Sequence, residues 1–236
     1  MGTALHPPQV IVNARGFYAV WLPADPDAVA KMVPEGLTPA EGCPVFMNQY
    51  RVDDSAQTSS HGQDDAFGSY SLLYLGADLA DLDAAPEVPG RWWTHYFNSS
   101  EPMARYAEAH GVPAVFSTAE TTLEIDGSRY VGTTTLDGTP VLRTIATVEI
   151  GSRPRANGQL RYITRVNGEF TSGRYAYVAD IAETVTFESI EFLEPNHPIY
   201  QLRPADPLTV TFGIWYDDMF FCYPGGEGPL NTLHGS

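Results

Sequence analysis

Lysine and histidine side chains, which could act as nucleophiles or general bases, are few in this 236-residue chain. Lys31 is its only lysine, and arginine supplies the rest of its 13 basic residues. Imine chemistry with a ketone therefore has one candidate amine. Among six scattered histidines, His95 lies in the aromatic run WWTHYF, where it could move protons near neutral pH. The alternative for His95 is a structural role, with its ring hydrogen-bonded within a sheet.

The motifs of several common enzyme classes are absent from the sequence. It contains no glycine-rich nucleotide-binding motif, no H-E-x-x-H and no G-x-S-x-G. Cys43 and Cys222 lie far apart and outside any Cys/His cluster, so we expect two buried apolar side chains and no metal site. Nothing in the sequence implies a cofactor.

The charge balance excludes some partners. The chain has 29 acidic and 13 basic residues, a net charge of −16, which would repel nucleic acids and anionic membrane surfaces. The first ten residues show no targeting pattern, and no stretch approaches the roughly 20 apolar residues of a membrane span. We therefore expect a cytoplasmic protein that binds a small molecule.

Two helices are predicted. Residues 25–33 begin with Asp-Pro-Asp, a capping residue followed by proline at the first helical position. Residues 101–110 have Pro102 near their start and Gly111 as a stop signal.

The remaining patterns indicate strands. Three dipeptides predict turns: Asp137-Gly138, Asn167-Gly168 and Ser172-Gly173. Alternation would place Trp93, His95 and Phe97 on one face of their strand. The predicted strand segments are 17–22, 45–52, 70–75, 92–97, 132–150, 160–166, 175–190 and 208–221.

Long antiparallel strands around a central helix predict an α+β fold with a closed or strongly curved sheet. We expect one domain over residues 1–236, because no linker divides the chain. The polar segment 53–67, which includes His61, is predicted to be a mobile loop, and residues 224–236 a coil tail.

Two segments resemble the acetoacetate decarboxylase superfamily. Residues 25–37, DPDAVAKMVPEGL, are similar to the family's helix after its first strand, and residues 101–113, EPMARYAEAHGVP, to its central helix. The likeness covers residues 10–222, mainly in the order and spacing of elements. It implies an acetoacetate decarboxylase-like fold, a curved antiparallel sheet or barrel with a few short helices around a central pocket, in a protein that assembles into homo-oligomers.

The family's catalytic lysine is missing. In the family the lysine after the proline forms a Schiff base with the substrate, but here Pro113 is followed by Ala114, Val115 and Phe116. Lys31 matches an ordinary surface lysine of the family. The resemblance therefore implies a relative that no longer works through an imine.

Other site positions follow from the resemblance one at a time. Arg15 matches an arginine that reaches the pocket and can grip a carboxylate, and Glu108 matches a retained glutamate that could be a general base. Asn48, or Gln49 if the register slips, replaces one glutamate, and Ser71 or Leu72 replaces another. Arg15 and Glu108 could instead form a structural salt bridge.

The candidate site is therefore rich in amides, hydroxyls and aromatic rings. We predict Arg15, Glu108, His95 and Asn48 as catalytic residues. We expect a roomy apolar cavity that Tyr175 also lines, although each aromatic could simply belong to the core. The predicted substrate-binding residues are Gln49, Tyr50, Tyr70, Ser71, Trp93, Ala114 and Phe116.

Three functions remain open at this point. The first is a lysine-independent lyase, isomerase or cyclase acting on a keto, enol or polyene intermediate of polyketide-like, specialised metabolism, by proton transfer or by holding a reactive conformer. The second is a non-catalytic small-molecule-binding relative. The third is a decarboxylase or aldolase that uses Lys31.

Overall fold

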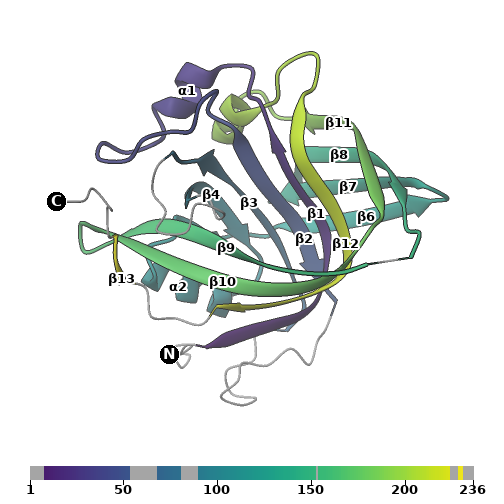
Figure 1. Ribbon diagram of the computed structural model, residues 1–236, viewed down its shortest axis with the longest axis horizontal. Coiled ribbons are helices and arrows are strands. Elements are labelled where there is room, and N and C mark those ends of the chain that lie inside the picture. Colours follow the sequence, from purple (N-terminus) through teal and green to yellow (C-terminus); the bar gives the residue numbers. More distant parts are fainter. Residues whose placement is uncertain (1–7, 54–67, 81–89, 153, 224–227, 231–236) are drawn as a thin grey trace.

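The computed structural model describes residues 8–53, 68–80, 90–152, 154–223 and 228–230. Its main feature is a closed seven-stranded barrel, in which β10 pairs with β12 and so joins the two ends of the sheet (Figure 1). Neighbouring barrel strands are antiparallel except β4 and β9. In order around the barrel the strands are β12 (Val210–Tyr223), β1 (Gln9–Trp21), β2 (Val45–Val52), β3 (Tyr70–Asp78), β4 (Gly90–Asn98), β9 (Arg155–Val166) and β10 (Glu169–Ile181).

A second sheet of four antiparallel strands lies against one side of the barrel (Figure 1). Two short strands pair with the barrel sheet, β5 (Ala114–Phe116) with β4 and β13 (Gly228–Pro229) with β10. The strands of the second sheet are, in order, β11 (Thr184–Phe192), β8 (Thr139–Glu149), β7 (Arg129–Leu136) and β6 (Glu120–Asp126). The predicted α+β class and curved, closed sheet are confirmed.

The two faces of the barrel strands build two separate cores. Phe17, Met47 and Leu75 face outward and pack between the barrel and the second sheet. The inward faces and the helix at residues 101–109 form a cluster in which ten of the thirteen tyrosines are buried. Successive residues of a strand point to opposite sides, so each long strand serves both cores.

The helices are short and begin where the sequence predicts. In α1 (Pro26–Ala30) the side chain of Asp25 accepts a hydrogen bond from the Ala28 amide, as a capping residue should. In α2 (Glu101–Ala109) one face is buried, and Gly111 follows the helix at φ +79°. A 3-10 helix, η2 (Pro198–Leu202), contacts α1. No helix in the described part of the chain is long and apolar enough to span a membrane.

Three predictions about strands are wrong. Segment 175–190 is not one strand, because β10 ends at Ile181 and β11 begins at Thr184 in the other sheet. Ser172-Gly173 is not a turn but lies inside β10, where the Tyr162 ring occupies the space that a side chain of Gly173 would need. The predicted coil tail contributes β13, while all of the loop predicted at 53–67 except Asp53 lies outside the described residues.

The alternation predicted along β4 is also wrong. The strand pairs Leu75 with His95 but Gly76 with Trp93, so Thr94 is an extra residue, a β-bulge. On the two sides of the bulge, opposite members of the predicted alternation point into the barrel. Trp93 and Tyr96 therefore share the barrel interior, whereas Phe97 packs on the outer core.

Candidate functional site

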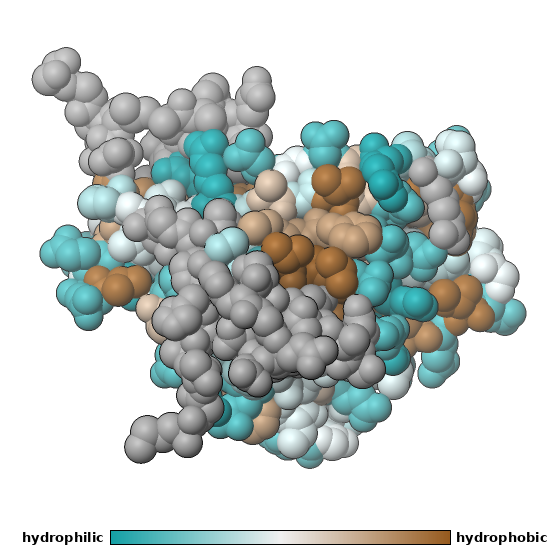
Figure 2. All heavy atoms as spheres, turned by 90° about the horizontal axis from the view of Figure 1, so that it is seen from below, coloured by the Kyte–Doolittle hydropathy of each residue, from teal (hydrophilic) through white to brown (hydrophobic). Residues whose placement is uncertain are grey.

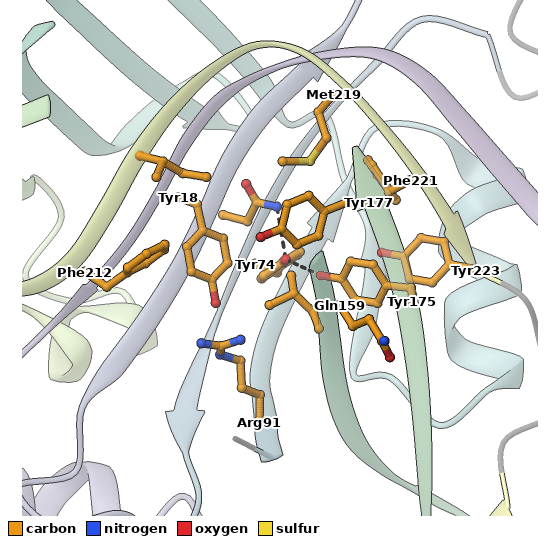
Figure 3. Close-up of a pocket in the computed structure, with 13 residues that line it drawn as sticks. Tyr18, Tyr74, Arg91, Gln159, Tyr175, Tyr177, Phe212, Met219, Phe221 and Tyr223 are labelled. Atoms are coloured by element: carbon orange, nitrogen blue, oxygen red, sulfur yellow. Dashed lines mark hydrogen bonds between the residues drawn. The ribbon is translucent and has the colours of Figure 1, made fainter. Parts of the chain in front are cut away.

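The barrel encloses a cavity of about 300 Å³ to which each of its seven strands contributes side chains (Figure 3). This volume lies at the lower end of the range for small-molecule sites. The residues that line it are Tyr18, Asn48, Tyr74, Arg91, Gln159, Leu160, Tyr175, Tyr177, Phe212, Ile214, Met219, Phe221 and Tyr223.

Asn48, on the cavity wall, is hydrogen-bonded to two buried phenols. Its Nδ2 donates to the Tyr74 hydroxyl over 3.0 Å, and its Oδ1 accepts from the Tyr216 hydroxyl. The Tyr74 and Tyr175 hydroxyls are 2.8 Å apart and share a hydrogen bond. Burial raises the pKa of each of these three tyrosines, so their phenols are neutral and can donate hydrogen bonds near neutral pH.

Arg91 brings a buried positive charge to the cavity. Its Nε donates to Oδ1 of Asp78 over 3.0 Å, and the two side chains are only 11% and 14% exposed. The guanidinium carbon lies 5.4 Å from the centre of the Tyr18 ring. Burial opposes the charged form, but Tyr18 and Asp78 raise the pKa of Arg91 above its ordinary value, so the cation persists.

Two cavity-lining residues connect the cavity to the surface. The Phe212 side chain is 50% exposed and contacts the Tyr18 ring edge-on at 6.1 Å between ring centres. Gln159, on β9, is exposed as well. On the face shown in Figure 2, hydrophilic side chains predominate, and apolar ones gather near the middle.

Some of the residues predicted for the site lie in the barrel. Asn48 and Tyr175 line the cavity. Tyr50, Tyr70 and Trp93 face the barrel interior but away from the cavity: the first two share a hydrogen bond at 3.2 Å, and Trp93 stacks on Tyr162 with ring centres 5.0 Å apart. Ala114 packs against this interior cluster without lining the cavity.

The predicted positions of Arg15 and Glu108 need correction. Arg15 lies on the same side of β1 as Phe17, outside the barrel, with a side chain 43% exposed and an ion pair to Asp53. Alternation along β1 turns Tyr18, not Arg15, inward. Glu108 is exposed on the outer face of α2, so it is not the buried base that was predicted.

Four further candidates also lie away from the cavity. Gln49 faces the second sheet, where its amide donates to Thr134 over 2.9 Å. Ser71 accepts a hydrogen bond from the Thr121 amide, and Phe116 is 54% exposed. His95 does not line the cavity either; its ring stacks on Phe97.

The sequence reasoning missed Arg91 and Tyr18. A usable signal existed, because Asp78 and Arg91 are opposite charges in the stretch between two neighbouring predicted strands, 70–75 and 92–97, and the structure pairs them directly. Nothing in the described residues groups three or more of the side chains that bind metals.

Comparisons with known proteins support the fold. No family model and no curated protein sequence matches the chain. Among solved structures, the enduracididine biosynthesis enzyme MppR complexed with pyruvate is similar at a TM-score of 0.63 and 13% identity, over 97% of this chain and 92% of that one. Acetoacetate decarboxylase from Legionella pneumophila is similar at a TM-score of 0.60 and 14% identity, over 94% of this chain and 86% of that one. An acetoacetate decarboxylase-like enzyme from Sphingomonas wittichii is similar at a TM-score of 0.60 and 15% identity, over 98% of this chain and 100% of that one.

Proposed function

We propose that this chain, which has the acetoacetate decarboxylase-like fold, is an enzyme that converts a keto, enol or polyene compound in its barrel cavity without forming an imine. The reaction would be that of a lyase, an isomerase or a cyclase. The position of Lys31 carries the proposal: the only lysine is exposed at the end of α1, on the outside of the barrel. No lysine side chain therefore reaches a substrate held in the cavity.

The side chains around the cavity favour catalysis by hydrogen-bond donation. One of the two phenolic protons of Tyr74 and Tyr175 lies in their shared hydrogen bond, the other can be donated to a ligand, and Arg91 adds a cation. Preorganised donors stabilise an oxygen that gains negative charge, as the oxygen of an enol or enolate does. No carboxylate or histidine is among the described residues that line the cavity. Polarising an oxygen and holding one reactive conformer are thus better supported than proton abstraction by a side chain.

The structural neighbours support a carbonyl substrate. MppR is described in complexes with pyruvate and with the condensation product of pyruvate and imidazole 4-carboxaldehyde. It is named as a biosynthetic enzyme. We extend this to the present chain as a proposed role in specialised metabolism, on a polyketide-like intermediate that is larger and more unsaturated than acetoacetate.

One observation favours a second candidate, a non-catalytic binding protein. The described lining residues include no general base, and a cavity without one could hold a ligand and release it unchanged. Homo-oligomers and a cytoplasmic location remain predictions. The edge strands β6 and β11 of the second sheet offer surfaces on which copies of the chain could pair.

Phenylpyruvate is a suitable test compound, because it combines an enol, a carboxylate and an aromatic body. The conversion of its enol to the keto form would be followed by NMR for the natural protein and for Lys31→Arg. Each would be assayed with and without earlier treatment with phenylpyruvate and borohydride, which are removed by dialysis before the assay. We expect acceleration above the buffer rate that neither borohydride nor the substitution removes. Inactivation by borohydride would support the Lys31 imine instead, and tight binding without acceleration would support the binding protein.

A further inference from the structure

Arg91 is the only charged side chain among the described residues that line the cavity. Its Nε is used by Asp78, and the terminal nitrogens point toward the Tyr18 hydroxyl (Figure 3). A guanidinium presents its donors in a planar fork, so the nitrogens beyond Nε can bind a second acceptor. The cavity side of this cation is thus available to a ligand.

The Tyr18 hydroxyl is a second, independent feature of the same place. Tyr18 is 4% exposed, and its oxygen has no hydrogen-bond partner among the described residues. Leaving a buried hydroxyl without a hydrogen-bond partner is energetically costly, so native structures usually pair such groups with protein, water or ligand. Burial raises the pKa of Tyr18 well above 10, which keeps its proton available for donation.

The rest of the cavity suits the body of an organic acid. Aromatic rings from β10 and β12, including Tyr175, Phe212 and Phe221, form its wall. The described lining contains no carboxylate that would repel an anion. Asp78 lies behind the guanidinium and holds it through Nε.

We propose that Arg91 and Tyr18 form a subsite for the carboxylate of an aromatic or unsaturated acid. The guanidinium binds the carboxylate through its terminal nitrogens, the Tyr18 hydroxyl donates to one of its oxygens, and the unsaturated body lies among the aromatic rings. This inference rests on the proposed function only in placing the substrate in the barrel cavity. It concerns binding, and it can be tested without any turnover.

Titration calorimetry with trans-cinnamate and trans-cinnamamide tests the subsite, because the two ligands differ only in the charged group. We expect cinnamate to bind about tenfold or more tightly than the amide, as charge-assisted hydrogen bonds to a buried cation should give. Tyr18→Phe removes one donor and should weaken cinnamate binding about three- to tenfold, with little effect on the amide.

A paired variant tests the cation without leaving an unpaired buried charge. Arg91→Met combined with Asp78→Asn should abolish the preference for cinnamate. Arg105→Met combined with Glu101→Gln removes an ion pair on the surface of α2, with the same net change of charge, and should preserve it. Equal binding of the two ligands by the natural protein, or a preference that survives the double substitution, would overturn the proposal. Absence of binding by both ligands would overturn it as well. Cinnamate binding without phenylpyruvate conversion would refute the proposed enzyme while leaving this subsite standing.

Discussion

The amide nitrogen of Asn48 donates to the hydroxyl of Tyr74, 3.0 Å away, while the amide oxygen accepts from Tyr216. Through Tyr74 the chain of hydrogen bonds continues to Tyr175. One side chain thus links strands β2, β3, β10 and β12 around the cavity. An amide suits this position because it donates and accepts at once, so each neighbouring phenol finds a partner.

Substitution of Asn48 by leucine should lower the free energy of unfolding by about 2–4 kcal/mol, because buried hydroxyls lose their partners. Urea denaturation would measure the change. Asn157→Leu is the matched control, since Asn157 is exposed on β9, and it should change stability by less than about 0.5 kcal/mol. Similar values for the two variants would show that the network contributes little.

Gly173 should not tolerate a side chain. A Cβ at this position would lie 2.2 Å from the Tyr162 ring, which itself stacks on Trp93. Gly173→Ala should therefore destabilise the protein by about 1–3 kcal/mol and change tryptophan fluorescence. Gly228→Ala, where no atom lies within 4 Å, is the control and should leave both unchanged. A Gly173→Ala protein with natural stability would contradict this packing.

Stability should fall below pH 6.5 because of His95. Burial, with a smaller effect of nearby His197, lowers the pKa of His95 to about 4. Between pH 6.5 and 4 the unfolded chain then binds a proton that the folded protein does not, so acid favours unfolding. We expect the free energy of unfolding to fall by an amount on the order of 3 kcal/mol between pH 6.5 and pH 4. Thermal melts of the natural protein and of His95→Gln over this pH range would measure the change. If the melting temperatures of the two proteins fall in parallel as the pH is lowered, His95 is not the cause.

Alkaline pH should act through the buried tyrosines. Burial raises the pKa of Tyr50, Tyr175 and Tyr223 well above 10 in the folded protein. Their contribution to stability is complete below pH 10 and is lost as pH rises further, because the unfolded phenols ionise first. Absorbance of phenolate at 295 nm should therefore rise together with loss of structure, in one cooperative step. Gradual ionisation of most tyrosines before unfolding would refute this expectation.

Local signals in the sequence predicted much of the fold. The Asp137-Gly138 and Asn167-Gly168 turns are present, with positive φ at all four residues, because this geometry has a strong residue preference. The helix predicted at 101–110 is also present, as α2 (Glu101–Ala109). The bulge at Thr94 could not be read from the chain, because it depends on how β3 pairs with β4.

The site was predicted less well than the fold. Asn48 was found through its place in a family pattern, and it does line the cavity. Arg15 was predicted and Arg91 was missed, although Arg15 faces solvent and Arg91 the barrel interior. Which of two arginines is buried depends on closure of the barrel between β10 and β12, and segments so far apart in the sequence carry no local signal of that contact.

Filling the cavity tests the central claim that the barrel interior is the reaction site. Ile214 lines the cavity, and Ile214→Trp would occupy it; Ile125→Trp, at a residue 50% exposed on β6, is the matched control. The measurement is the rate of phenylpyruvate enol conversion by each folded variant. The account predicts that Ile214→Trp falls to the buffer rate while Ile125→Trp keeps the natural rate. Full activity in Ile214→Trp would contradict it and place the chemistry elsewhere.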